Sequence, residues 1–146
     1  GLHKTALTRM LEDIADACKK IAIAIDSGAL EGNMGNLSSA NVQGEVQKAL
    51  DVVTNEIFIE ANQRGGYVAG MVSEEIDKAI EIAEKHRQNG QYLLLFDPLD
   101  GSSNVNVNIS VGTIFSILLS PNAQPELDDF LQAGVNQLCA GYALYG

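Results

Sequence analysis

The sequence predicts an α/β protein with two long N-terminal helices followed by short β-strands. Two observations support this. Apolar residues recur at helical spacing through the N-terminal part of the chain, whereas the apolar runs after Gly65 and Gly66 are short, as buried strands are. With 46% hydrophobic and 19% charged residues among 146, the composition is that of one globular domain with a core of its own.

A first helix is expected over residues 5–27. Charged residues take one face of this segment, and apolar residues spaced three and four apart take the other. The apolar positions are Leu7, Met10, Leu11, Ile14, Cys18, Ile21 and Ile25. Gly28 is expected to end the helix, because glycine is the usual residue just past a helix C-terminus.

The polar, glycine-containing residues 31–41 predict a loop, and a second amphipathic helix is expected over 42–62. Gly65 and Gly66 should stop it. Two such helices joined by a short loop would bury their apolar faces as an antiparallel pair or against a sheet.

Three strands are expected in the second half, over residues 67–72, 92–96 and 110–119. The charged, helix-prone residues 76–88 predict an excursion on the surface. Residues 134–146 are apolar and small, and a helix is expected there.

The acidic balance excludes some classes of function. A net charge of −10 argues against binding to nucleic acid, which needs clustered lysine and arginine, and against adhesion to anionic membranes. No apolar run approaches the length of a membrane span, and no signal peptide is visible. Cys18 and Cys139 lie far apart among small apolar residues, which predicts buried free thiols in a cytoplasmic protein.

The strongest chemical signal is the stretch that follows the strand at 92–96, namely Asp97-Pro98-Leu99-Asp100-Gly101-Ser102-Ser103. Taken alone, it is as compatible with a plain type I turn as with a metal site. As a site, it could hold divalent cations beside a phosphate. Gly101 would let the backbone approach the phosphate, and the amides and hydroxyls of the two serines would cradle it.

A second acidic pair, Glu74 and Glu75, follows the strand at 67–72. If the two strands are neighbours, their carboxyl ends bring this pair together with Asp97 and Asp100. Oxygen ligands without histidine or cysteine suit Mg²⁺ or Mn²⁺. Glu74 and Glu75 alone are more typical of a solvated helix start, and Asp51 alone of an exposed helix residue, but their joint presence favours a metal site.

Like charges so close together need cations to persist. A pair of carboxylates about 4 Å apart costs about 4 kcal/mol at intermediate dielectric. Two metals about 3.5–4 Å apart would offset this repulsion and clamp the attacking and leaving oxygens of a phosphoryl transfer. Asp97 could bridge the metals, and the Leu99 carbonyl could add a neutral ligand. With water activated by metal, Ser102 or Ser103 as a covalent nucleophile is the weaker hypothesis.

The sequence resembles the N-terminal half of class I fructose-1,6-bisphosphatase, which belongs to the superfamily of magnesium-dependent, lithium-sensitive phosphomonoesterases. The similarity runs through nearly the whole chain. The matching words include NVQGE (41–45), LDVVTNE (50–56), AGMVSEE (69–75), LLLFDPLDGSSN (93–104), SVGTIFSIL (110–118) and AGYALYG (140–146).

The resemblance implies a role for each matched residue. The metal ligands would be Glu74, Asp97, the Leu99 carbonyl and Asp100. Contacts to the substrate's 1-phosphate would come from Asp100, Gly101, Ser102 and Ser103. Asp51 and Glu75 would activate the attacking water, and Glu45 matches a carboxylate on a mobile loop that helps complete the metal site.

The resemblance also implies a fold, an activity and a setting. The fold would be the layered sugar-phosphatase fold, in which two long N-terminal helices pack on a mixed β-sheet. The expected reaction is metal-dependent hydrolysis of the 1-phosphate of fructose 1,6-bisphosphate, in gluconeogenesis or the Calvin cycle, by a cytoplasmic homotetramer using Mg²⁺ or Mn²⁺. Sedoheptulose-1,7-bisphosphatase and an inactive Mg²⁺-binding fragment are the alternatives. Residues 1–146 would form the N-terminal domain, the C-terminal domain being absent, with little activity alone.

Overall fold

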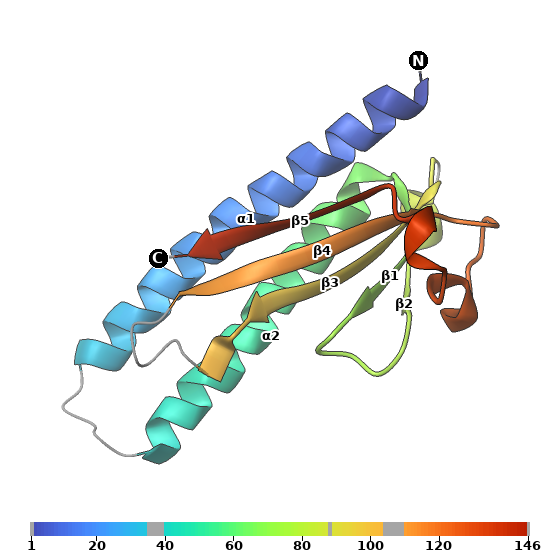
Figure 1. The fold of residues 1–146 in the computed structure, drawn as a ribbon. Coiled ribbons are helices and arrows are strands. Elements are labelled where there is room, and N and C mark those ends of the chain that lie inside the picture. The colour runs from blue at the N-terminus through green and yellow to red at the C-terminus, as the bar shows by residue number, and fades with distance from the viewer. Residues whose placement is uncertain (1, 35–39, 88, 104–109, 146) are drawn as a thin grey trace.

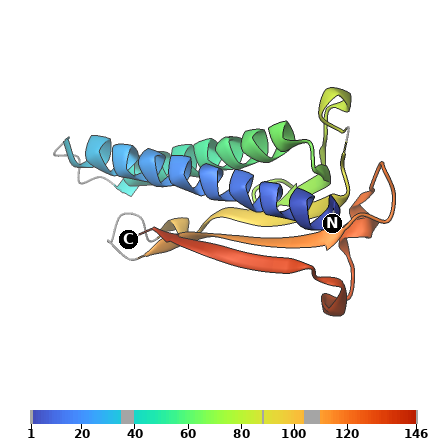
Figure 2. The same cartoon turned by 90° about the horizontal axis from the view of Figure 1, so that it is seen from above.

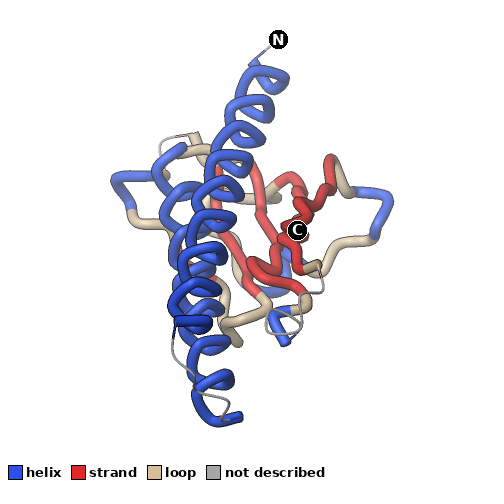
Figure 3. The backbone as a smooth tube through the Cα atoms, turned by 90° about the vertical axis from the view of Figure 1, so that its left-hand side faces the viewer, coloured by secondary structure: helices blue, strands red, loops and turns tan. Residues whose placement is uncertain are grey.

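The computed structural model describes residues 2–34, 40–87, 89–103 and 110–145. Two helices lie side by side and antiparallel over one face of a five-stranded sheet (Figure 1, Figure 2), and Figure 3 shows the helix layer beside the sheet. The helices are α1 (Leu2–Met34) and α2 (Ala40–Gly65), and the strands are β1 (Val68–Ser73), β2 (Ile80–Glu81), β3 (Tyr92–Asp100), β4 (Val111–Leu119) and β5 (Cys139–Tyr145). Short 3₁₀ helices in the described part of the chain include η1 (Glu84–His86), η3 (Leu127–Phe130) and η4 (Gly134–Asn136). The predicted α/β class and helix-on-sheet layers are confirmed.

The first helix ends later than predicted. Gly28 does not end α1, which continues to Met34. A glycine inside a helix costs about 1 kcal/mol relative to alanine, and the helix formers Ala29, Leu30 and Glu31 offset that cost. The predicted loop at 31–41 is therefore shorter, and residues 35–39 lie outside the described part. The stop of α2 at Gly65 and Gly66 is confirmed, and Gly66 takes a φ of +75°.

The main core lies between the helices and the sheet. Met10, Ile14, Ala17 and Ile21 of α1 pack with Phe58 of α2 against buried residues of the sheet, namely Val68, Met71, Leu94, Phe96 and Ile117. The rings of Phe58 and Phe96 lie 4.4 Å apart between centroids. The stripe predicted on α1 is thus the one that is buried.

The sheet order is β2-β1-β3-β4-β5. The β1 and β3 strands run parallel, while β3 with β4 and β4 with β5 run antiparallel. The carboxyl ends of β1 and β3 therefore lie next to each other at the same end of the sheet, beside the helix layer.

The strand expected over residues 92–96 runs on to Asp100 as β3, so the plain type I turn, one of the two interpretations of the stretch after residue 96, does not form at residues 97–100. Its register with β4 shifts between the pairs Asp97↔Ile114 and Asp100↔Gly112. Pro98 and Leu99 together oppose Thr113, which is a β-bulge. A proline is tolerated at a bulge because the ladder there lacks a regular hydrogen bond.

The helix expected over 134–146 is also wrong. Within residues 134–145, only the short η4 is helical, and residues 139–145 form β5, whose exposure alternates along the strand as a period of two requires. A small residue is needed where β5 pairs with β4, because a Cβ on Gly141 would lie 2.6 Å from the Phe115 ring. The excursion at 76–88 contains β2 and η1 instead of a longer helix, and Ile82 within it is fully buried.

Gly112 is expected to be intolerant of a side chain. A Cβ there would lie 2.6 Å from the backbone oxygen of Ala143 on the paired strand, which cannot move without breaking the ladder. Gly112→Ala should lower the free energy of unfolding by about 1–3 kcal/mol in chemical denaturation. Gly44→Ala is the control: nothing lies within 4 Å of its Cβ, and in α2 it should add up to about 1 kcal/mol. Equal effects of the two changes would contradict this packing.

Candidate metal centre

Three carboxylates converge where β1 and β3 end. One oxygen from each of Glu74, Glu75 and Asp97 lies within 4.8 Å of the others. The backbone N–H of Glu74 donates to the Phe96 carbonyl at 3.0 Å, which ties the turn after β1 to β3. The structure thus brings these side chains together as the strand order predicts.

Asp97 is the most enclosed of the three. Burial raises the pKa of its carboxyl; the Leu99 N–H, 3.1 Å from Oδ1, opposes this, and the charges of Asp100 and Glu74 add to the rise. Asp100 is exposed and lies against Asp97, outside the group of three. The Leu99 side chain is buried against Leu50 of α2, which anchors the segment from inside.

The α2 helix adds Asp51 to the cluster. Burial raises the pKa of Glu75, and the charges of Asp51, Glu74 and Asp97 raise it further. Oδ1 of Asp51 is one of two buried side-chain oxygens without a hydrogen-bond partner among the described residues. A buried oxygen that lacks a donor beside three further carboxylates is suited to a cation or to water held by one.

Glu45 also lies on α2, and it is exposed and helical in this structure. The described contacts do not connect it to the cluster, and it lies on a helix, not on the loop that the resemblance implies. Gly101 takes a φ of +76°, which favours glycine, while Ser102 is half-buried and Ser103 exposed. The phosphate-binding role of residues 101–103 stays a prediction.

Sequence reasoning missed three polar residues beside the cluster. The Ser73 hydroxyl donates to Oδ1 of Asn55 at 2.7 Å and accepts the Glu75 N–H at 3.2 Å, so it holds the turn that carries Glu75. The Gln47 amide donates to Oγ of Ser102 at 3.4 Å. Gln47, Asp51 and Asn55 are spaced four apart on α2, a polar stripe that could have been found in the sequence.

This arrangement fits a hard divalent cation. The converging ligands are all carboxylates, two of them have a raised pKa because like charges and burial disfavour the ionised form, and a buried oxygen lacks a partner. The combination could bind one or more such ions and a phosphate near them.

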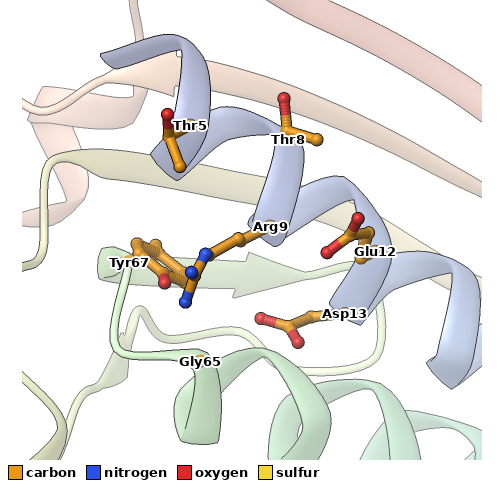
Figure 4. A pocket seen from close by; sticks show the side chains of 7 residues that line it. All are labelled: Thr5, Thr8, Arg9, Glu12, Asp13, Gly65 and Tyr67. Carbon is orange, nitrogen blue, oxygen red and sulfur yellow. The ribbon is translucent and has the colours of Figure 1, made fainter. Parts of the chain in front are cut away.

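The largest described hollow, about 720 Å³, lies elsewhere. It is lined by Thr5, Thr8, Arg9, Glu12, Asp13, Gly65 and Tyr67, and Figure 4 shows Arg9 extended toward Tyr67. It sits where α2 ends and β1 begins, at the opposite end of β1 from the carboxylates. None of the predicted site residues lines it, so the hollow is separate from the candidate centre.

A pH dependence follows for the metal-free protein. Both Glu75 and Asp97 have a folded-state pKa above the ordinary values of 4.5 and 3.8, so the folded state binds protons more tightly than the unfolded state. Their contribution to stability should therefore fall as pH rises from those ordinary values through the raised ones. Chemical denaturation in the presence of chelator, repeated across this pH range, should show that the free energy of unfolding declines less steeply with pH in Glu75→Gln than in the unaltered protein. Glu84→Gln in η1 is the surface control, and an unchanged slope in Glu75→Gln would contradict the prediction.

Comparisons with known proteins agree with one another. The family model described as "Fructose-1-6-bisphosphatase, N-terminal domain" matches residues 2–146. A fructose-1,6-bisphosphatase class 1 of Halorhodospira halophila is 55% identical over 141 residues, covering 95% of this chain and 41% of the relative. The crystal structure of Leishmania major fructose-1,6-bisphosphatase in holo form matches with a TM-score of 0.79 at 30% identity, over 97% of this chain and 43% of that one. The chain thus spans about two fifths of the length of both relatives.

Proposed function

Because the chain belongs to the fructose-1,6-bisphosphatase family, matching its N-terminal domain, we propose that the natural protein hydrolyses the 1-phosphate of D-fructose 1,6-bisphosphate. The products are fructose 6-phosphate and phosphate. The convergence of Glu74, Glu75 and Asp97 at the ends of two parallel strands is the observation that most supports this.

The residues of this chain have distinct parts in the proposed reaction. Glu74, Asp97, Asp100 and the Leu99 carbonyl hold Mg²⁺ or Mn²⁺. When bound, such ions supply Lewis-acid stabilisation of the charge on the phosphate and its leaving oxygen. Asp100 and residues 101–103 hold the 1-phosphate in line.

The remaining carboxylates handle the proton. Asp51 and Glu75 orient the attacking water and accept its proton, and Glu45 helps to complete the metal site. Glu75 suits the role of a base because one of its carboxylate oxygens lies within 4.8 Å of an oxygen of Glu74 and of Asp97, beside the position proposed for the metal.

We propose that residues 1–146 act as the N-terminal domain and that the residues that select the sugar lie outside them. The chain covers 41% of its relative from Halorhodospira halophila, which supports this division. On its own, the 146-residue chain is expected to have little activity.

The activity is tested by following ³¹P NMR of fructose 1,6-bisphosphate with the natural protein and Mg²⁺. Loss of the 1-phosphate signal with retention of the 6-phosphate signal is expected. Faster turnover of sedoheptulose 1,7-bisphosphate would assign that substrate instead. Mg²⁺ binding without release of phosphate from either sugar would overturn the enzymatic proposal.

We propose that the natural protein is a cytoplasmic homotetramer that acts in sugar-phosphate metabolism. Cys18 and Cys139 are both free, half-buried thiols, which is usual in a reducing compartment. No described helix has the length and hydropathy that a membrane span requires. Exposed apolar side chains on the helices, Ile23 and Val52, could serve a subunit interface. Sedimentation of the natural protein tests the oligomeric state.

A further inference from the structure

Thr113 stands opposite the bulge in β3. It is fully buried, and it is the one residue of β4 that faces both Pro98 and Leu99. A bulge takes a carbonyl out of the regular ladder. The Thr113 hydroxyl donates to that carbonyl, on Pro98, at 2.8 Å.

Tyr145 completes this chain of hydrogen bonds from β5. Its hydroxyl lies 2.7 Å from Oγ1 of Thr113. Thr113 has a single hydroxyl hydrogen, and the Pro98 carbonyl can only accept, so Tyr145 must donate to Thr113. The pairs Thr113↔Ala143 and Val111↔Tyr145 make the two side chains diagonal neighbours on one face of the sheet.

The bulge matters because of where it places two carboxylates. Residues three apart in a regular strand project from opposite faces. One extra residue in the strand reverses that alternation for everything beyond it. Asp97 and Asp100 accordingly project from the same face, and Asp100 lies near enough to Asp97 for their like charges to repel.

We infer that Thr113 and Tyr145 are positioning residues of the metal centre, which fix the Pro98 carbonyl and thereby the bulge that sets Asp97 beside Asp100. This inference rests on the proposed function, since it takes that segment of β3 to be metal-binding. Neither residue touches the reacting groups. Both act through the backbone of Pro98 and Leu99.

The test is a double-mutant cycle on Mn²⁺ affinity, measured by calorimetry in the natural protein. Thr113→Val keeps the shape and removes the hydroxyl, and it should weaken Mn²⁺ binding about 10–100-fold, as outer partners of metal ligands do. Tyr145→Phe should weaken it about threefold to fivefold, the worth of one ordinary hydrogen bond. The double variant should match Thr113→Val alone, because phenylalanine keeps the ring packing and the tyrosine hydroxyl reaches the Pro98 carbonyl only through the threonine.

Matched controls separate positioning from general damage. Thr113→Ser retains the hydroxyl and should restore most of the affinity. Tyr142→Phe, on the exposed face of β5, and Ser116→Ala, whose hydroxyl accepts from Gln137, should leave Mn²⁺ binding unchanged. If Thr113→Val does not fold, the Tyr145→Phe and Thr113→Ser variants decide.

A metal-independent measurement keeps the inference distinct from the proposed function. The Leu99 amide, bonded to Oδ1 of Asp97, should exchange its hydrogen faster in metal-free Thr113→Val than in Ser116→Ala. If the unaltered protein binds no Mn²⁺, the proposed function fails and this exchange rate alone decides the inference. Additive effects in the cycle, or unchanged affinity and exchange in Thr113→Val, would overturn it.

Discussion

Replacing Asp97 with asparagine is expected to lower kcat/KM of the natural protein for fructose 1,6-bisphosphate by about a thousandfold. Asp97 is the most enclosed of the three converging carboxylates, and asparagine keeps its shape while removing the charge that would hold the cations. Losing one preorganised charge-stabilising group already costs about a hundredfold to a thousandfold in comparable sites. Steady-state release of phosphate at saturating Mg²⁺ measures the loss.

The same change should stabilise the metal-free protein. Burial and the charges of Asp100 and Glu74 disfavour the ionised form of Asp97, as its raised pKa indicates, so a neutral side chain relieves repulsion. Each kcal/mol relieved raises Tm by about 2–4 °C for a chain of this size. Asp128→Asn, an exposed change in η3, is the control. Retained activity in Asp97→Asn would exclude Asp97 as a metal ligand, and a lower Tm in chelator would contradict the repulsion argument.

Divalent metal is expected to stabilise the folded protein by a large amount. A ligand that binds only the folded state at a hundred times its Kd adds about 2.7 kcal/mol to the free energy of unfolding. Calorimetry during a Mg²⁺ titration should show Tm rising with concentration and falling back when chelator is added. The rise should be greater at higher pH, since the carboxylates must be ionised to bind.

The variant Glu74→Gln, which removes one of the converging carboxylates, tests where Mg²⁺ binds, and Glu126→Gln is its control. It should abolish most of the Mg²⁺-dependent rise in Tm, whereas Glu126→Gln, exposed in the loop before η3, should preserve it. A rise of equal size in Glu74→Gln would show that Mg²⁺ stabilises the protein from another place.

The centre could be predicted because its parts follow from strand adjacency. Glu74 and Asp97 each come at the end of an apolar run, and two parallel neighbours bring such ends together whatever the details of packing. The buried stripe on α1 was predictable for a similar reason, since the helical period alone decides which side chains share a face.

The bulge was beyond prediction because Pro98 is as typical of a turn as of an irregular strand. What decides between them is Thr113, distant in sequence, whose hydroxyl satisfies the Pro98 carbonyl within the sheet. The prediction of a helix over residues 134–146 was wrong for a related reason. Alanine and glycine carry no clear period, and the partner strand β4, with Phe115 over Gly141, imposes the extended form.

Anomalous X-ray diffraction from crystals of the natural protein soaked in Mn²⁺ tests the metal centre most directly. The account predicts a strong anomalous peak within coordinating distance of the carboxylates of Glu74 and Asp97, and its loss in Asp97→Asn. No peak between these side chains at saturating Mn²⁺, or a peak that persists unchanged in Asp97→Asn, would contradict it.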